Sequence, residues 1–163
     1  MEKAQSKSTE IAKIGIVAAL YVAVTMFIAP LSYGAVQLRL AEGFNHLTVF
    51  NKRYIAALTV GCAIANITSP LGIVDVIFGA LGTLVMTSIS YWIAKHIQNP
   101  IYKMTVSTVV CTIFSWSVAL ELNIVSHLPF WPTYLTVASG ELISLLVGMV
   151  IFTALSRRID LSK

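Results

Sequence analysis

Residues 42–50 read EGFNHLTVF, and whether this short stretch crosses a membrane decides the fold of the chain. It is only about two helical turns long, but apolar runs without charges lie on both sides of it. Counting it as a crossing makes the number of membrane spans even, and leaving it out makes that number odd. The flanking runs and the positions of the charges therefore settle the question.

Long apolar runs place the chain among integral membrane proteins. Hydrophobic residues make up 57% of its 163 residues and charged residues 11%, whereas soluble domains carry about a quarter charged residues. A helix needs roughly 20 apolar residues to cross a hydrocarbon core of about 30 Å. Six spans would use about 120 residues, so we expect residues 1–163 to form a single membrane-embedded domain. Besides the opening stretch, the runs expected to cross are Ile14–Pro30, Tyr54–Asn66, Val74–Ala94, Met104–Leu120 and Leu135–Leu155.

The basic residues predict the number and direction of the crossings. Lysine and arginine are enriched in cytoplasmic loops, and both tails of this chain are basic. Both termini are therefore predicted to be cytoplasmic, which requires an even number of spans. With six spans, ten of the eleven basic residues lie on the cytoplasmic side and only Arg39 lies outside. We predict an all-α membrane protein with six transmembrane helices, two of them short, in which Glu42–Phe50 crosses, either tilted or extended back through Gln37–Ala41.

Four carboxylates lie where the six-span arrangement puts the outer part of the membrane, and they are Glu42, Asp75, Glu121 and Glu141. A carboxylate at membrane depth costs several kcal/mol unless it is paired or faces water or a ligand. Together with Arg39, the four make a local net charge of −3. This pattern indicates an outward-facing cavity for a small ligand that is cationic or rich in hydrogen-bond donors. The alternative is that Arg39 pairs with Glu42 while the other carboxylates lie in the headgroup zone.

Amide and aromatic side chains accumulate in the same layer. Gln37, Asn45 and Asn66 supply donors and acceptors, and Trp131 and Tyr134 supply flat surfaces. Carboxylates, amides and aromatic rings together suit a planar heterocycle, stacked by the rings and bound along its edge by the polar groups. The alternative for the aromatic residues is an interfacial belt, where Trp and Tyr gather in membrane proteins.

The first apolar run carries small residues on one face. Gly15, Ala19 and Ala23 recur every four residues, and such faces let helix backbones approach closely in lipid. The face serves either a partner subunit or packing within the protein's own helix bundle. The spacing by itself favours packing within the bundle.

Catalytic motifs are absent from the sequence. It contains no G-x-x-x-x-G-K-[ST] loop for ATP, no metal-binding H-E-x-x-H or Cys-Cys-His cluster, and no G-x-S-x-G nucleophile elbow. We therefore expect no enzyme activity, no cofactor and no metal site. Because the basic residues are explained by membrane orientation, we also expect no nucleic-acid partner.

The blocks Tyr33–Glu42 (YGAVQLRLAE), Gly61–Gly79 (GCAIANITSPLGIVDVIFG) and Leu81–Leu84 (LGTL) closely resemble the QueT family. Members of this family are substrate-binding S components of energy-coupling factor (ECF) transporters. The resemblance implies a six-helix subunit of the bacterial cell membrane that captures its substrate from outside. It also implies docking on one membrane coupling subunit and two ATPase subunits. Because Ala19–Ala23 matches the A-x-x-x-A pattern by which S components contact the coupling subunit, the resemblance favours partner binding for the small-residue face.

The resemblance further implies a ligand, because the family is associated with queuosine precursors, chiefly 7-aminomethyl-7-deazaguanine. The aminomethyl group of this compound is cationic near neutral pH and matches the acidic excess. Its guanine-like edge offers adjacent N–H donors that a carboxylate accepts in bidentate fashion. We predict that Glu42 or Glu141 binds this edge and that Asp75 meets the amine. The ligand carbonyl is then expected to accept from Arg39, Gln37 or Asn66.

Three alternatives are compatible with the sequence. The first keeps the fold but changes the ligand to another vitamin or nucleobase-like compound. The second is a stand-alone ion-coupled carrier that uses the membrane carboxylates as proton sites. The third is a membrane adaptor whose small-residue face is its whole function. In the transporter interpretation, the outer segment Tyr33–Ala41 is expected to act as a gate.

Overall fold

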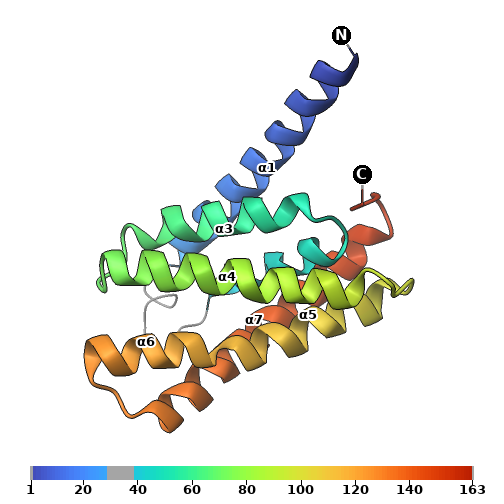
Figure 1. Ribbon diagram of the computed structural model, residues 1–163. Helices are drawn as coiled ribbons and strands as arrows, with labels where there is room; N and C mark the ends of the chain where they lie inside the picture. The colour runs from blue at the N-terminus through green and yellow to red at the C-terminus, as the bar shows by residue number, and fades with distance from the viewer. Residues whose placement is uncertain (1, 29–38, 163) are drawn as a thin grey trace.

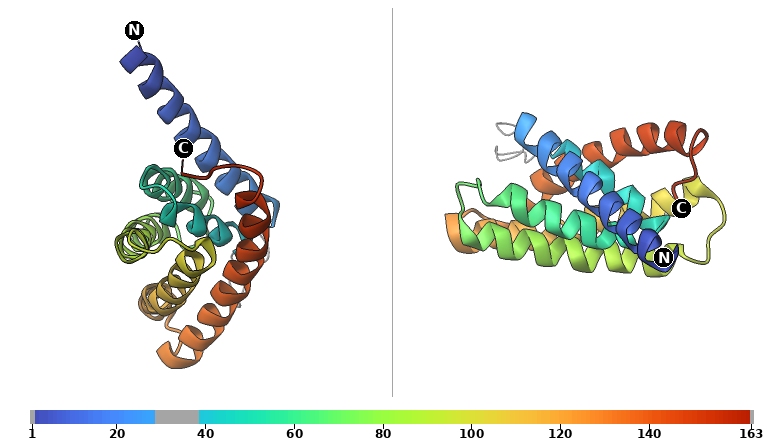
Figure 2. Two further views of the ribbon diagram at one scale, coloured as in Figure 1. Left: turned by 90° about the vertical axis from the view of Figure 1, so that its right-hand side faces the viewer. Right: turned by 90° about the horizontal axis from the view of Figure 1, so that it is seen from above.

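The computed structural model describes residues 2–28 and 39–162, and within these ranges every regular element is a helix (Figure 1). The all-α prediction is therefore confirmed. The helices pack side by side in one bundle, from which the first turns of α1 project (Figures 1 and 2). In chain order they are α1 (Glu2–Phe27), the 3-10 helix η1 (Leu40–Val49), α3 (Arg53–Asn66), α4 (Ile73–Ala94), α5 (Pro100–Phe114), α6 (Trp116–Ser126) and α7 (Phe130–Ser156).

Four described stretches of helix are long and apolar enough to cross a membrane, and each overlaps one of the long runs predicted from the sequence. Counting α5 and α6 as one span, the described chain has six helical segments, which agrees with the predicted number. The crossing by η1 and the side on which each terminus lies stay predictions. The four long stretches are Lys7–Phe27, Ile73–Ala94, Pro100–Ser126 and Phe130–Ser156.

A break at Ser115 separates α5 from α6. The Ser115 hydroxyl donates to the carbonyl oxygen of Cys111 at 3.4 Å, and the Ser115 amide donates to the same oxygen at 3.2 Å. Serine hydroxyls that bond back to the preceding turn often bend helices. The bend therefore has a local cause in the sequence and does not interrupt the apolar stretch.

The stretch that decides the topology forms η1, a ten-residue 3-10 helix in the interior of the bundle. Its glycine, asparagine and β-branched residues are poor α-helix formers, and eight of its ten residues are buried. It contacts α1, α3, α4, α5 and α7. At about 2 Å of rise per residue, η1 is about 20 Å long, which is shorter than a hydrocarbon core of about 30 Å.

A backbone crossing of η1 with α7 requires glycine on both sides. A Cβ atom on Gly43 would lie 2.9 Å from the Cα atom of Gly148, and one on Gly148 would overlap the backbone of Gly43. The two glycines therefore let the buried 3-10 helix lie directly against the longest helix. This contact holds the buried side chains of η1 close to α7.

Basic residues gather at one end of the bundle, which we call the basic end. The start of α3, the end of α4, the start of α5 and the end of α7 meet there (Figures 1 and 2). A buried apolar cluster fills the neighbouring interior and includes Leu47, Val49, Met104 and Phe152. The residues of the basic end are Lys52, Arg53, Lys95, Lys103, Arg157 and Arg158.

Arg53 ties three parts of the chain together at the basic end. Its Nη1 donates to Oε1 of Glu10 on α1 at 2.6 Å, and its Nη2 donates to the carbonyl oxygen of Ser162 at 3.1 Å. Asn51 donates to the same carbonyl oxygen from Nδ2 at 2.7 Å. The segment after α7 is therefore held against the turn between η1 and α3.

Candidate functional site

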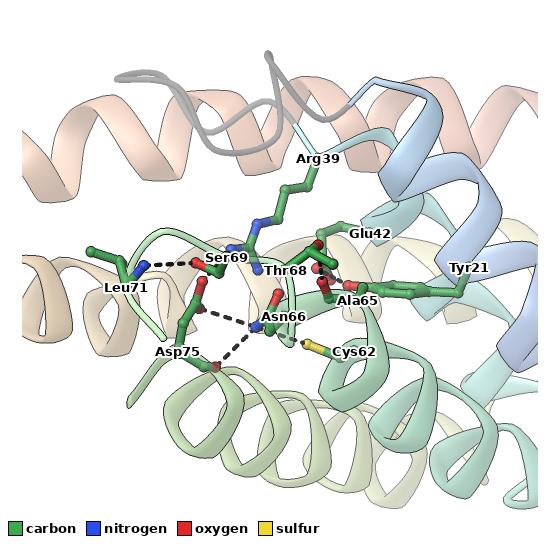
Figure 3. Close-up of polar contacts among 10 residues, drawn as sticks. All are labelled: Tyr21, Arg39, Glu42, Cys62, Ala65, Asn66, Thr68, Ser69, Leu71 and Asp75. Atoms are coloured by element: carbon green, nitrogen blue, oxygen red, sulfur yellow. Dashed lines mark hydrogen bonds and ion pairs between the residues drawn. The ribbon is translucent and has the colours of Figure 1, made fainter. Parts of the chain in front are cut away.

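Polar side chains from four elements meet at the end of the bundle opposite the basic end (Figure 3). Arg39 precedes η1, Glu42 lies on η1, Asn66 ends α3, and Asp75 lies in the first turn of α4. All four side chains are buried. The structure thus brings together four residues that the sequence analysis selected as substrate-binding. With Tyr21 and Asn45 we call them the polar cluster.

Glu42 is held on both of its carboxylate oxygens. Tyr21 on α1 donates its hydroxyl to Oε1 at 2.5 Å, and Asn45 donates from Nδ2 to Oε2 at 2.7 Å. Residues three apart eclipse in a 3-10 helix, which is why Asn45 lies above Glu42 on the same face of η1. Two hydrogen bonds to a buried carboxylate offset much of the cost of its burial.

Asp75 is the centre of the second half of the polar cluster. Nη2 of Arg39 lies 3.5 Å from its Oδ2, and Nδ2 of Asn66 donates to its Oδ1 at 3.0 Å and to its backbone oxygen at 2.9 Å. Asn66 has room for these bonds because a Cβ at Gly79 would overlap its amide nitrogen. These contacts join the end of α3 to the start of α4.

A cavity of about 40 Å³ lies next to the polar cluster, and we call it the site cavity. Arg39, Glu42 and Glu141 line its charged side, and the rings of Phe78 and Phe114 line its apolar side. A volume of this size holds only a few water molecules. The cavity therefore combines carboxylates, one guanidinium and flat apolar surfaces around a narrow space.

Two carboxylates near this site are not fully satisfied. Oε1 of Glu141 on α7 and Oε1 of Glu121 on α6 are buried and have no hydrogen-bond partner among the described residues. Leaving a buried acceptor without a donor costs about 1–3 kcal/mol, and more when the group is charged. Because Glu141 lines the site cavity, its oxygen is available to an N–H donor from a ligand there. Glu121 interacts electrostatically with Asp75 and Arg39, which places it near the same site.

The predicted aromatic residues lie elsewhere. The Trp131 side chain is 71% exposed, and the Tyr134 hydroxyl donates to the carbonyl oxygen of Ile113 at 3.4 Å. Neither residue lines the site cavity. Both rings pack on Phe130 at the start of α7, an arrangement that also suits an interfacial belt. Gln37, the remaining predicted amide, lies outside the described residues.

The small-residue face of α1 points away from the bundle. Gly15, Ala19 and Ala23 are exposed, whereas Ala18 and Tyr21 of the same helix are buried. A Cβ on Gly15 would have no atom within 4 Å. Packing within the described bundle therefore does not use this face.

Sequence reasoning did not select Tyr21, Phe78 or Phe114 as site residues, and it counted Glu121 among the four outer carboxylates without assigning it a ligand contact. Tyr21 bonds to a residue 21 positions along the chain, and no local pattern signals such a contact. The two phenylalanines lie in apolar runs, where nothing distinguishes a residue that faces a cavity from one that faces lipid. Glu121 carried the only available signal, a carboxylate at membrane depth. Among the described residues, no group of three or more His, Cys, Asp or Glu side chains is placed to hold a metal ion.

Comparison with known proteins adds two matches. The family model described as QueT transporter matches residues 11–157. A protein of Lactococcus lactis subsp. cremoris (strain MG1363), described as queuosine precursor transporter QueT, is 38% identical over 168 residues, which cover 98% of this chain and 99% of the relative. No solved structure matches the fold.

Proposed function

Because this chain belongs to the QueT transporter family, we propose that it is the substrate-binding S component of an ECF-type importer for a queuosine precursor. Its family consists of transporters and not of enzymes. The proposed ligand is 7-aminomethyl-7-deazaguanine or a close 7-deazaguanine, captured from outside the bacterial cell. In this proposal the protein is multi-pass, with both termini in the cytoplasm.

The observation that carries the proposal is that one buried carboxylate oxygen on Glu121 and one on Glu141 have no hydrogen-bond partner among the described residues. In a membrane-embedded bundle such groups are costly, and they are typically found where a substrate or ion binds. A ligand with a cationic amine and adjacent ring N–H donors would satisfy them. This chemistry fits a 7-aminomethyl-7-deazaguanine.

The hydrogen bonds favour one assignment of the ligand contacts over another. Glu42 already accepts from Tyr21 and Asn45, whereas Glu141 lines the site cavity and has one oxygen that accepts from no donor in the described part of the chain. We therefore assign the guanine-like edge to Glu141. We treat Glu42 as a structural residue of the site, held in place by Tyr21 and Asn45. The amine is assigned to Glu121, whose Oε1 has no partner among the described residues and which interacts electrostatically with Asp75. The ligand carbonyl is assigned to Arg39 or Asn66.

Stacking in the proposed site is assigned to Phe78 and Phe114, which line the site cavity. Typical ligand pockets measure about 300–1,000 Å³, so a bicyclic base has to widen a cavity of about 40 Å³. Met86 lines the cavity, and an unbranched methionine can move at low cost. The gate predicted at Tyr33–Ala41 lies largely outside the described residues and is kept as part of the proposal.

The proposed partners are a membrane coupling subunit and two ATPase subunits. The chain has no ATP-binding loop of the G-x-x-x-x-G-K-[ST] type, so in this proposal the partner chains bind and hydrolyse ATP. The exposed small-residue face of α1 is the proposed contact with the coupling subunit, because close helix approach needs residues without bulk.

Uptake of labelled 7-aminomethyl-7-deazaguanine into proteoliposomes tests this function. We expect uptake with the coupling and ATPase subunits plus ATP, and none with this chain alone. Uptake by this chain alone under a proton gradient would instead support an ion-coupled carrier whose carboxylates are proton sites. Thermal-shift screening of the purified chain is the companion test, and absence of binding by every deazaguanine would reject the ligand class.

A further inference from the structure

A crevice at the basic end lies between the start of α5 and the end of α7, and the polar site does not extend into it. It consists of two adjoining hollows that share one residue, Arg157. The first, which we call the basic hollow, has a volume of about 430 Å³. The second, the apolar groove, has a volume of about 330 Å³. Figure 2 shows the segment after α7 turning back from the end of that helix toward the other helix ends.

The basic hollow has an excess of positive charge. Lys103, Arg157 and Arg158 line it together with one carboxylate, Asp160. Oδ1 of Asp160 accepts from the amide of Ser162 at 3.0 Å and from its hydroxyl at 2.6 Å. Neither arginine forms an ion pair with another described residue. The hollow is therefore suited to an anionic group that several donors can approach.

The apolar groove continues from the basic hollow along the outside of the bundle. Its lining consists of one residue of α5 and four of α7 next to Arg157, and these are Ile101, Met149, Val150, Thr153 and Ala154. Ile101 is 47% exposed and Val150 is 72% exposed, so their side chains face the lipid and not the protein interior. A flexible hydrocarbon chain fits this lining, whereas a soluble anion would leave the groove uncovered.

We propose that this crevice binds one anionic phospholipid, with its phosphate in the basic hollow and an acyl chain in the apolar groove. Basic pockets between membrane helices on the cytoplasmic side bind anionic headgroups, and the basic end is the predicted cytoplasmic end. The charge selects an anionic headgroup, and the adjoining groove selects a lipid over free phosphate. The inference does not depend on the identity of the transported substrate.

Native mass spectrometry of the full chain in detergent tests the charge requirement. Phosphatidylglycerol and phosphatidylcholine with identical acyl chains are added separately, and inorganic phosphate is added as a third probe. We expect one retained phosphatidylglycerol, about tenfold less phosphatidylcholine, and no comparable retention of phosphate. Equal retention of both lipids would overturn the proposal. Phosphate that competes fully with the lipid would show that the site takes the free anion.

Two pairs of variants locate the site. Arg157→Gln with Arg158→Gln should reduce phosphatidylglycerol retention about tenfold, whereas Lys52→Gln with Lys95→Gln, which removes two charges at the same end outside the crevice, should not. Ala154→Phe should fill the apolar groove and reduce retention, and Ala56→Phe on the exposed side of α3 should not. Equal losses in target and control variants would mean non-specific lipid contact. Unchanged lipid retention with weakened docking of the coupling subunit would assign the crevice to that protein instead.

Discussion

The four carboxylates of the site differ in how many hydrogen bonds they already accept. Both oxygens of Glu42 and both oxygens of Asp75 have a donor or cation within 3.5 Å. Glu121 and Glu141 each keep one buried oxygen without a described partner. Neutralising a satisfied carboxylate should therefore disturb the fold, and neutralising an unsatisfied one should chiefly disturb the ligand.

Substitution of Glu141 by glutamine should weaken ligand binding with little effect on stability. A hydrogen bond to a charged group contributes about 1.5–3 kcal/mol, so the Kd for 7-aminomethyl-7-deazaguanine should rise at least about tenfold. Isothermal titration in detergent gives this Kd, and thermal unfolding gives the stability. Glu10→Gln removes a carboxylate at the basic end and is the control for the Kd alone, which should not change, because this variant also breaks the Glu10–Arg53 ion pair. An unchanged Kd for Glu141→Gln would contradict the proposed role.

Substitution of Tyr21 by phenylalanine should have the opposite effect: it should chiefly lower the stability of the protein and not its affinity for the ligand. It removes the donor to Oε1 of Glu42 and leaves a buried carboxylate oxygen unsatisfied, which costs about 1–3 kcal/mol. The midpoint of unfolding in detergent should fall accordingly. Tyr102→Phe removes a hydroxyl from a residue that is 64% exposed and should change stability by less than about 0.5 kcal/mol. Equal midpoints for the two variants would show that the Tyr21 hydroxyl does not stabilise Glu42.

At the scale of elements, η1 and α7 come closer at Gly43 and Gly148 than any other described glycine comes to a neighbouring backbone. Gly148→Ala would place a Cβ atom 2.8 Å from the carbonyl oxygen of Gly43. Overpacking of this kind costs about 1–3 kcal/mol or more, and both partners are backbone and cannot rotate away. We expect lower thermal stability and, because η1 carries Glu42, weaker ligand binding as well.

Gly15→Ala is the control for this substitution, because a Cβ there has no atom within 4 Å. Alanine is favoured over glycine within a helix by up to about 1 kcal/mol, so the control should be neutral or slightly stabilising. A Gly148→Ala variant as stable as the wild type would mean that η1 and α7 can separate without loss.

The helices of the long apolar runs could be predicted from the sequence, because an apolar segment that crosses a membrane has to satisfy its backbone hydrogen bonds internally as a helix. Tyr54–Asn66 was predicted almost to the residue, since α3 begins at Arg53 and ends at Asn66. The 3-10 form of η1 could not be predicted. The contact of η1 with Gly148, which is about a hundred residues away along the chain, was not signalled by any local pattern either. The bend at Ser115 was equally hidden within an apolar run.

Site residues could be predicted only where a charged or amide side chain lay in an otherwise apolar stretch of sequence. Arg39, Glu42, Asn66 and Asp75 stood out as polar groups in apolar surroundings, and the structure brings them together (Figure 3). Phe78 and Phe114 did not stand out, because an aromatic ring is ordinary in a membrane helix. Trp131 and Tyr134 were chosen for their chemistry, but their place on the first turns of α7 puts them away from the site cavity.

For the whole molecule, the six-span prediction puts the polar site on the outside and the basic end in the cytoplasm. A membrane-impermeant maleimide should then label Ser126→Cys, at the exposed end of α6, in intact cells. It should label Ser8→Cys, which is exposed near the start of α1, only after permeabilisation. Background should be low because Cys62 and Cys111 are buried. Labelling of both variants in intact cells would reject the even number of crossings.

Docking on the energising subunits should depend on the outer face of α1. Leucine at Ala19 and Ala23 adds bulk to an exposed face and should abolish co-purification with the coupling subunit. Ligand binding in detergent should be unchanged, because neither residue lines the site cavity. Ala56→Leu, on the exposed side of α3, should leave both properties intact. Loss of binding together with docking would indicate that the face supports the fold and is not a contact surface.

The hydrogen bonds from Arg53 and Asn51 to the Ser162 carbonyl oxygen also bear on where an affinity tag should be placed. An affinity tag or fluorescent fusion joined directly after residue 163 would disturb these hydrogen bonds and the turn that leads into α3. The first turns of α1 project from the bundle (Figure 1). A tag at the amino end, or a long flexible spacer at the carboxyl end, should therefore give a higher yield of folded protein.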